Sequence, residues 1–248
     1  MTRRLDGVAA VLFDVNGTLV HIRTDEHLEE IYRSVGHFLS YQGVDLRRDQ
    51  VREEYFSRLK RQKCESTEAH PEFDAVQIWR SIIDDFGTDY TRALPAQRRA
   101  ELPAAVAEIF RGVSRKKLKL YPHVRHVLNR LRERYPLAIV TDAQSAYARA
   151  ELHKVRILDY FDSIIVSGDH GFRKPDSRLF EYALAGLNVT PAQSVYVGND
   201  MFRDVHGAQA AGMRTVMFES SQGDKHYQEC EPDFRISDHR ELLRLLGM

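Results

Sequence analysis

The chain has 248 residues, of which 43% are hydrophobic and 29% charged, so it can bury one large core or two smaller ones. Its 36 basic residues balance its 36 acidic residues, which excludes a broad electrostatic attraction to nucleic acid or to an anionic membrane. The two cysteines, Cys64 and Cys230, have no zinc-type or redox-type partner nearby, which argues against a disulfide framework. Near the start, the longest apolar run (residues 8–13) is too short for a signal core or a membrane span. We therefore expect a cytoplasmic protein.

The first apolar run, residues 8–13, is followed directly by polar residues. Asp14 comes first, and Asn16 and the pair Gly17-Thr18 complete a tight turn. An Asp at the carboxyl end of a strand is well placed to attack a bound ligand. A carboxylate that accepts a phosphoryl group splits one difficult displacement into two easier ones. Taken alone, the same segment fits equally well a turn in which the Asp side chain caps the strand.

The stretch from His21 to Lys119 contains no convincing strand. Apolar residues recur at helical spacing in four places, residues 28–39, 51–59, 76–86 and 104–110. We expect these stripes, which include Trp79, to form the core of a helical bundle. The sequence therefore predicts an all-helical module at 21–119, inserted into another domain formed by 1–20 and 120–248.

Four further apolar runs follow, at residues 137–140, 164–166, 195–197 and 215–218, with helical patterns between them. Short continuous apolar runs that end in polar residues are typical of parallel strands buried on both faces. The alternation of strand and helix predicts a doubly wound, Rossmann-like α/β domain. Residues 234–236 are a candidate last strand, followed by a helix through Leu246. Ligands of such sheets bind beyond the carboxyl ends of the strands.

Two polar clusters belong to the middle of this domain. Thr141 and Asp142 follow the run 137–140, and the Thr hydroxyl can donate a hydrogen bond to a phosphoryl oxygen. Both residue types also cap helices, which is the simpler interpretation of this pair alone. Lys174 precedes Pro175 at an expected helix start, since proline is favoured in the first turn. An ammonium group held there can neutralise both a nucleophile and a phosphoryl group.

A third cluster, Asn199, Asp200 and Asp204, follows the run 195–197. Acidic residues in a loop just after a strand can hold Mg²⁺, a hard cation that prefers oxygen ligands. A surface turn that leads into a helix explains this cluster equally well. Together, however, the clusters supply a nucleophile, a hydroxyl, a cation and a second carboxylate at successive strand ends. These groups are the parts needed to position and neutralise a transferring phosphoryl group.

In combination these motifs resemble those of the haloacid dehalogenase (HAD) superfamily, in its phosphoglycolate-phosphatase-like branch. The segment Asp14-Val15-Asn16-Gly17-Thr18 resembles the first motif, Asp-x-Asp-Gly-Thr. Thr141 matches the second motif, Lys174-Pro175 the third, and Gly198 through Asp204 the fourth. The resemblance covers roughly residues 5–20 and 120–240. By position and helicity, the inserted module resembles the cap domain of that branch.

The resemblance implies a Mg²⁺-dependent phosphohydrolase that acts on a small phosphorylated metabolite. Asp14 would accept the phosphoryl group, and its carboxylate would bind Mg²⁺ together with the backbone carbonyl of Asn16. The remaining site residues implied by the motifs are Thr141, Asp142 and Lys174 for the phosphoryl group, and Asn199, Asp200 and Asp204 for the metal.

Two positions depart from the family pattern. Asn16 stands where family phosphatases have an Asp that protonates the leaving oxygen and later activates water. An amide has no useful pKa near neutrality, and losing such acid–base help costs ~10²- to 10⁴-fold in rate. Asn199 stands at the usual first acid of the fourth motif, where the neighbouring Asp200 is the candidate substitute.

These departures leave alternatives open. The chain is a slow phosphatase, or a protein whose phosphorylated Asp14 persists, or one in which Asn16 was introduced to trap a bound state. Asn16 before Gly17 is also prone to deamidation, which would restore an acid in part of the protein. A metal-independent 2-haloacid dehalogenase-like hydrolase also fits, because position 16 need not be acidic in that branch. The retained Asp200 and Asp204 favour metal-assisted phosphoryl transfer over it. From another class, a catalytically weak protein could bind a phosphorylated ligand and signal by closing its cap.

Overall fold

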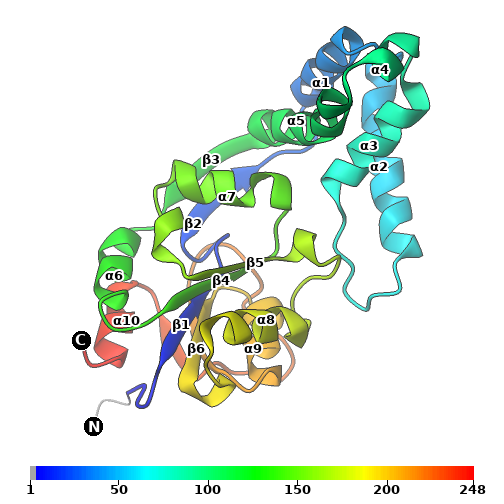
Figure 1. Ribbon diagram of the computed structural model, residues 1–248. Helices are drawn as coiled ribbons and strands as arrows, with labels where there is room; N and C mark the ends of the chain where they lie inside the picture. Colours follow the sequence, from blue (N-terminus) through cyan, green and yellow to red (C-terminus); the bar gives the residue numbers. More distant parts are fainter. Residues whose placement is uncertain (1–3) are drawn as a thin grey trace.

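The structure, a computed structural model that describes residues 4–248, has a sheet-containing part and a separate group of helices (Figure 1). All strand pairs of the six-stranded sheet are parallel, and the strand order is β5-β4-β1-β6-β7-β8. The strands are β1 (Ala10–Phe13), β4 (Leu137–Thr141), β5 (Ser163–Val166), β6 (Ser194–Gly198), β7 (Arg214–Phe218) and β8 (Phe234–Ile236). Each of the five apolar runs forms one of these strands, and the candidate last strand is present as β8. The predicted doubly wound α/β fold is confirmed.

Helices cover both faces of this sheet. Val11 and Phe13 of β1 pack in one hydrophobic cluster with side chains of α6 (Val124–Leu131), α7 (Ser145–Lys154) and α10 (Arg240–Leu245). Ala10 and Leu12 point to the opposite face and pack with α8 (Ser177–Leu187) and α9 (Gly207–Ala210). Because both faces are buried, the strands are continuously apolar, which is why the sequence located them well.

The helical part has its own hydrophobic core. Its helices are α1 (Glu29–Tyr41), α2 (Arg48–Glu65), α3 (Ala75–Phe86), α4 (Asp89–Ala93) and α5 (Ala96–Ser114). Trp79 is fully buried there, stacked on Tyr55 at 4.9 Å between ring centroids, with Phe110 at 5.9 Å. This supports the expectation that the apolar stripes pack against one another. Helix α5 begins at Ala96, eight residues before the apolar stripe that starts at Ala104, and it contains Pro103, which is buried.

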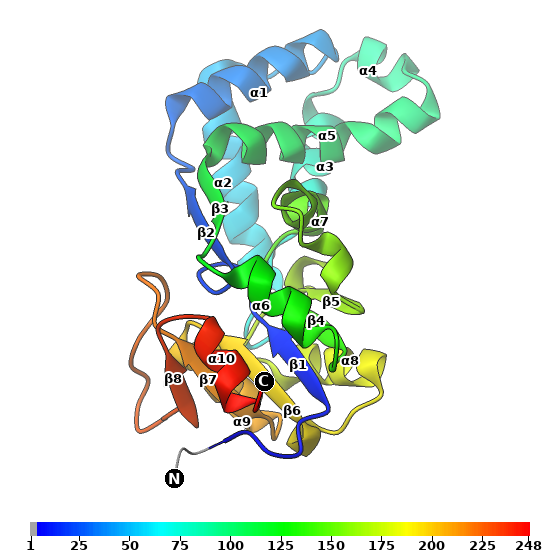
Figure 2. The same cartoon turned by 90° about the vertical axis from the view of Figure 1, so that its left-hand side faces the viewer.

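A two-stranded antiparallel ribbon joins the two parts (Figure 2). It consists of β2 (Val20–Thr24) and β3 (Arg115–Leu120), with Ile22 opposite Leu118. The expectation that residues 21–119 contain no strand is therefore wrong at both ends of that stretch. These strands are rich in charged residues and are only partly buried, so they lack the apolar run that marks a strand of the main sheet.

The loop between α2 and α3 docks on the sheet-containing part, and we call its residues 68–75 the strap. The backbone carbonyl of His70 accepts a hydrogen bond from the Arg173 N–H at 2.9 Å, and the Glu72 N–H donates to the Gly171 carbonyl at 2.9 Å. Gln144 Nε2 donates to the Phe73 carbonyl at 2.6 Å, and its Oε1 accepts from the N–H of residue 75 at 2.8 Å. The ribbon and the strap thus connect the two parts at separate places.

The remaining regular segments are short. They are three 3₁₀ turns, η1 (Leu158–Tyr160), η2 (Ser167–Asp169) and η3 (Pro191–Gln193), and a π-helical turn, η4 (Met201–His206). Among residues 4–248, no helix has the length and apolar character needed to cross a bilayer.

Candidate active site

The site forms at the carboxyl edge of the sheet, where three adjacent strands end. Asp14 follows β1, Thr141 is the last residue of β4, and Asn199 follows β6. Because β1 lies between β4 and β6 in a parallel arrangement, these residues meet at one edge. Lys174 reaches the same edge from the segment that precedes α8. The expectation that α8 starts at Pro175 is off by two residues, since Asp176 caps a helix that begins at Ser177.

Lys174 is the centre of the polar network. Its Nζ donates to Asp14 Oδ1 at 2.8 Å and to Asp204 Oδ1 at 2.6 Å. The hydroxyl of Tyr196 lies 3.0 Å from the same Nζ and donates to the Val140 carbonyl at 2.8 Å. Lys174 is only 3% exposed, so one ammonium holds two carboxylates together out of water.

This arrangement perturbs the ionisation of the buried groups. Burial is the largest influence on Asp14 and raises its pKa to about 6, against the opposing effect of Lys174. Burial would lower the pKa of Lys174, but the charges of Asp14 and Asp204 raise it well above its ordinary value. Lys174 therefore stays protonated, and its charge offsets that of the ionised carboxylates.

Thr18 and Asn199 extend the network on the other side of Asp14. The Thr18 hydroxyl lies 3.1 Å from Asp14 Oδ2 and 2.9 Å from Asn199 Oδ1, and it can donate to one of them at a time. Asn199 Nδ2 donates to the Gln222 carbonyl at 2.8 Å. Gly17 has a φ of +91°, and a Cβ there would lie 2.4 Å from Asn199 Nδ2. Glycine is thus required for the turn to approach Asn199 so closely.

Asp204 fixes the loop after β6. Its Oδ2 accepts hydrogen bonds from the backbone N–H groups of Asn199 at 2.9 Å and Asp200 at 3.0 Å. Its Oδ1 is held by Lys174. A Cβ at Gly198 would lie 2.3 Å from the Asp204 Cβ, so only glycine leaves room for this carboxylate. Asp204 consequently positions the loop and Lys174 together.

Asp200 makes different contacts. Its Oδ2 accepts from Arg203 Nη2 at 2.6 Å and from the Asp224 N–H at 3.1 Å, and its Oδ1 caps η4 through the N–H groups of Phe202 and Arg203. Burial raises the pKa of Asp200, but these bonds outweigh it and lower the pKa overall. In this structure the Asp200 carboxylate is therefore occupied by a helix start and an arginine.

Thr141 and Asp142 sit beside Lys174. The Thr141 hydroxyl is 2% exposed and has no hydrogen-bond partner among the described residues. Burying a hydroxyl without a partner is costly, so this atom has an unused donor for a ligand oxygen. Asp142 Oδ1 accepts from the Lys174 N–H at 3.0 Å, and its Oδ2 lies 3.5 Å from Arg173 Nε. The Asp142 carboxylate thus anchors the segment that carries Lys174.

A cleft between the two parts opens next to this network. Asn16 and Asn199 line it near the network, while Asp14 and Lys174, at 5% and 3% exposure, lie behind that lining. The other lining side chains come from the sheet-containing part and from the helical part, and they include Glu26, Glu72, Arg111, Tyr147, Arg173 and Arg203.

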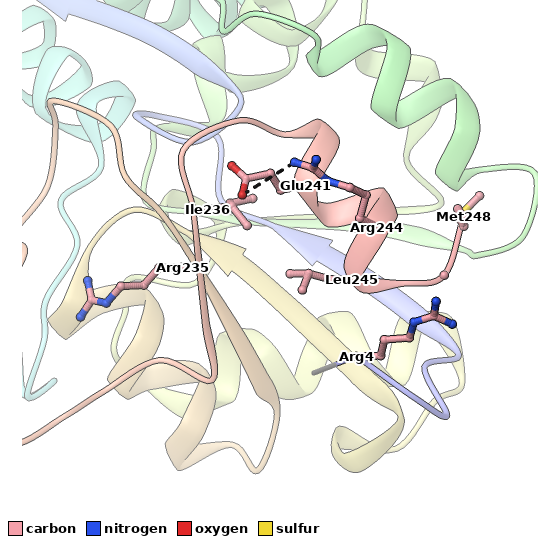
Figure 3. A pocket seen from close by; sticks show the side chains of 8 residues that line it. Arg4, Arg235, Ile236, Glu241, Arg244, Leu245 and Met248 are labelled. Atoms are coloured by element: carbon pink, nitrogen blue, oxygen red, sulfur yellow. Dashed lines mark ion pairs between the residues drawn. The ribbon is translucent and has the colours of Figure 1, made fainter. Parts of the chain in front are cut away.

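Another cavity, beside β8 and α10, has a different character (Figure 3). Figure 3 shows Arg4 and Arg235 on opposite sides of it, and the only ion pair drawn there joins Glu241 and Arg244. The basic groups do not converge on one point, and the candidate catalytic residues lie elsewhere. The cleft beside Asn16 is therefore the candidate active site.

The network also contains residues that the sequence did not single out. Tyr196 lies within β6 and faces the opposite side from Val195 and Val197, yet its hydroxyl reaches Lys174. A tyrosine inside a buried strand was the available signal, because a buried hydroxyl needs a partner. Gln222 contributes only its backbone carbonyl to Asn199, and no residue-type pattern could have revealed it.

The number and charge of the oxygen atoms near Asp14 determine which cation could bind there. The described residues include no cluster of three or more His, Cys, Asp or Glu side chains arranged for a metal ion. The side-chain oxygens that lie together here are those of Asp14 and Asn199, both beside the Thr18 hydroxyl. An all-oxygen set fits a hard cation such as Mg²⁺, with less negative charge than a site built from several carboxylates.

Comparisons with known proteins agree with this geometry. The model of the family described as "Haloacid dehalogenase-like hydrolase" matches residues 11–218. A glyceraldehyde 3-phosphate phosphatase of Methanopyrus kandleri is 30% identical over 245 residues, which are 95% of this chain and 96% of that protein.

Two solved structures are similar in fold. A HAD phosphatase from Thermococcus onnurineus is 27% identical with a TM-score of 0.59, over 97% of this chain and 98% of that one. A 2-haloacid dehalogenase from Pseudomonas syringae is 21% identical with a TM-score of 0.68, over the same shares of the two chains, and shows the fold alone.

Proposed function

The chain belongs to the haloacid dehalogenase-like hydrolase family, and we propose that it is a phosphatase that transfers the phosphoryl group of a small phosphomonoester to Asp14. The observation that carries this proposal is the single buried ammonium of Lys174, bonded to both Asp14 and Asp204. The unpartnered Thr141 hydroxyl nearby supports it further. The similarity to a curated phosphatase along nearly the whole chain favours phosphoryl transfer over dehalogenation.

The reaction follows from the residues. A carboxylate oxygen of Asp14 forms a bond to phosphorus, and the bond between phosphorus and the leaving-group oxygen breaks. That oxygen keeps the electron pair and takes a proton from water, because the Asn16 amide has none to give near neutrality. A second water then attacks phosphorus and gives up a proton, which neutralises the hydroxide left by the first step; the phosphorus bond to Asp14 breaks, and the carboxylate is restored. Lys174 offsets charge on the phosphoryl oxygens, and the Thr141 hydroxyl, with the backbone at Asp142, orients them.

We also propose that the phosphatase depends on Mg²⁺. The Asp14 carboxylate, the Asn199 amide oxygen and the backbone carbonyl of Asn16 would hold the ion. When bound, Mg²⁺ supplies positive charge that stabilises the transferring phosphoryl group. Asp204 supports this site through the N–H groups of Asn199 and Asp200. Asp200 itself contributes only if it exchanges its bond to Arg203.

In this proposal the two parts have distinct roles. Residues 4–20 and 120–248 form the catalytic domain, and residues 21–119 form a cap that contacts the substrate; residues 1–3 of the predicted domain lie outside the described residues. The separate hydrophobic core of the helices and the cleft lined from both sides support this division. The free thiols of Cys64 and Cys230 support a reducing compartment such as the cytoplasm.

The test is phosphate release from a panel of small phosphomonoesters, with and without Mg²⁺. We expect slow, Mg²⁺-dependent release by the native chain and none by Asp14→Ala. Release that survives in Asp14→Ala would contradict the proposal. Halide release from 2-haloacids without Mg²⁺ would replace it with dehalogenation.

A second candidate function rests on the two amides that line the cleft near the network. Asn16 and Asn199 place two neutral amides at this edge of the site, where the family pattern has carboxyl groups. A phosphorylated ligand that stabilises the chain against heat but is never hydrolysed, even by Asn16→Asp, would favour a binding protein.

A further inference from the structure

The cleft beside the proposed catalytic residues is lined by charged groups of both signs. Three arginines and three acidic residues contribute, and they come from both parts of the chain. Because the leaving group of a substrate would occupy this space, the charges that remain unpaired there determine which leaving groups fit.

Each of the three arginines already has an acidic partner. Arg111 makes two parallel bonds to the Glu151 carboxylate, from Nε at 2.8 Å and from Nη2 at 3.0 Å. The pairs Arg203–Asp200, at 2.6 Å, and Arg173–Asp142, at 3.5 Å, account for the other two. Each arginine of the cleft is therefore engaged by a carboxylate, although Glu151 is shared with Arg115 at 3.5 Å.

Glu72 has no such partner. Its Oε1 accepts from the Phe73 N–H at 3.1 Å and its Oε2 from the Ser167 hydroxyl at 2.7 Å, and both donors are neutral. No ion pair involves Glu72 within residues 4–248. Burial raises the pKa of this carboxyl, opposed by the bond from Ser167 and the charge of Arg173. A partly buried carboxylate with no cation within ion-pair distance is costly, so a cationic ligand would stabilise it.

Glu26 is the second acid without an ion pair, although the charge of Arg111 acts on it at longer range. It follows β2 and lines the same cleft as Glu72. Its carboxylate makes no hydrogen bond or ion pair with any residue in the described part of the chain. Tyr147 lines the cleft beside it, with its ring 4.5 Å from the Arg111 guanidinium carbon. Among the described residues, these two cleft carboxylates form no ion pair, and the arginines act on them only at longer range.

We propose, on the basis of the proposed function, that the substrates are phosphomonoesters whose leaving group carries an ammonium, recognised by Glu26 and Glu72. An ammonium has three donors and no acceptor, which matches two carboxylates that line the same cleft. Lys174 and Thr141 take the phosphoryl end, so the cleft separates the two charges of such a substrate. A leaving group with a carboxylate meets like charge in the same cleft.

The experiment uses three phosphonates that cannot be hydrolysed, so binding is measured independently of turnover. These probes are 2-aminoethylphosphonate, 2-hydroxyethylphosphonate and phosphonoacetate, which differ only in the group remote from phosphorus. Calorimetric titration of the native chain with Mg²⁺ near neutral pH should give the tightest binding for the amine. We expect its Kd to be on the order of tenfold below that of the hydroxyl probe, with phosphonoacetate weakest.

Matched variants assign the preference to the two acids. Glu26→Gln and Glu72→Gln should each reduce the ratio of the amine and hydroxyl Kd values to about threefold or less. Glu108→Gln removes the same charge from an exposed position on α5 and should leave the ratio unchanged. Ser167→Ala removes the hydroxyl that binds Glu72 but keeps the Glu72 carboxylate. It should therefore retain the preference for the amine probe. This result would show that the preference depends on the charge of Glu72 and not on the docking of the strap.

Equal binding of all three probes, or a preference for phosphonoacetate, would overturn the inference while leaving the phosphoryl site intact. An unchanged ratio in both glutamate variants would do the same. Failure of every probe to bind the native chain would instead contradict the proposed function, and the inference with it.

Discussion

Asn16 lines the cleft with an amide at the position where a phosphatase of this kind would use a carboxyl group. We expect Asn16→Asp to raise kcat for phosphate release by ~10²- to 10⁴-fold, because it adds a proton donor for the leaving oxygen and a base for water. Steady-state kinetics on one phosphomonoester measures this. Asn129→Asp, the same change at an exposed position on α6, is the control and should leave kcat unchanged. No gain in Asn16→Asp would mean that position 16 does not limit the reaction.

Asn199 offers an oxygen without charge at the proposed metal site. Its Oδ1 already faces Thr18, and its Nδ2 is used by Gln222. We expect Asn199→Asp to lower the Mg²⁺ concentration for half-maximal activation by on the order of tenfold, because Mg²⁺ affinity rises with the charge of its ligands. A titration of activity against Mg²⁺ tests this. If the half-maximal concentration rose, the lost bond to Gln222 would outweigh the added charge and Asn199 would not be a metal ligand.

His239 makes the stability of the chain depend on pH. Burial between aromatic rings lowers its pKa from 6.5 to about 4, and its Nε2 has no hydrogen-bond partner among the described residues. Below pH 6.5, His239 of the unfolded chain therefore binds a proton, whereas the buried His239 of the folded chain stays neutral until the pH approaches 4. The contribution of His239 is present above pH 6.5 and is lost as the pH falls through about 4.

His239→Phe keeps an aromatic ring next to Phe218 and removes the titration. Between pH 7 and pH 4.5 we expect the native chain to lose about 2 kcal/mol more unfolding free energy than this variant. Urea unfolding at the two pH values measures the difference. Equal losses in the two proteins would show that His239 takes up its proton without unfolding.

At the scale of elements, the strap is held to the sheet-containing part by one side chain above all. Gln144 is 4% exposed and bonds both the carbonyl of Phe73 and the N–H of residue 75. Gln144→Ala leaves two buried backbone groups without partners, and we expect it to cost about 1–3 kcal/mol of unfolding free energy. The fluorescence of Trp79, the sole tryptophan, reports this loss from within the helical core. Gln97→Ala, at an exposed position of α5, should cost little.

The sequence predicts the strands that are buried on both faces better than the strands that are partly exposed. Strands β1, β4, β6 and β7 lie between two layers of helices, so their apolar runs stand out. Strands β2 and β3 pair only with each other, and their exposed positions carry His, Arg and Lys. Pro103 suggested a helix start near residue 104, but it lies inside α5 next to the buried Leu102. Tertiary packing there overrides the local preference of proline.

The candidate site was easier to predict than the cap. Asp14, Lys174, Asn199 and Asp204 form one network because parallel topology brings strand ends to one edge. The positions of the backbone determine which donor each carboxylate of the loop contacts. The hydrogen bond that Arg203 donates to Asp200 could therefore not be predicted from residue types. The cleft residues Glu26, Glu72 and Arg111 come from three separate segments, and no short motif connects them.

At the scale of the whole molecule, two hydrophobic cores are joined by the ribbon and by the strap, and the cleft lies where they meet (Figures 1 and 2). The proposed nucleophile Asp14 lies in the sheet-containing part, whereas Glu26 and Glu72 lie in segments that flank helices of the helical part. If the strap moved away from the sheet-containing part, Glu72 would move away from Asp14. We therefore expect the substrate to be selected while the strap is docked.

The central claim is that Asp14 carries the phosphoryl group during the reaction. The chain is mixed with a reactive phosphomonoester and Mg²⁺, quenched rapidly and reduced with borohydride, which converts an aspartyl phosphate to homoserine. Because Asn16 cannot activate water, the phosphorylated form should accumulate, and peptide mapping should find homoserine at position 14 with less of it in Asn16→Asp. Phosphate release without modification of Asp14, or modification at another residue, would contradict the account.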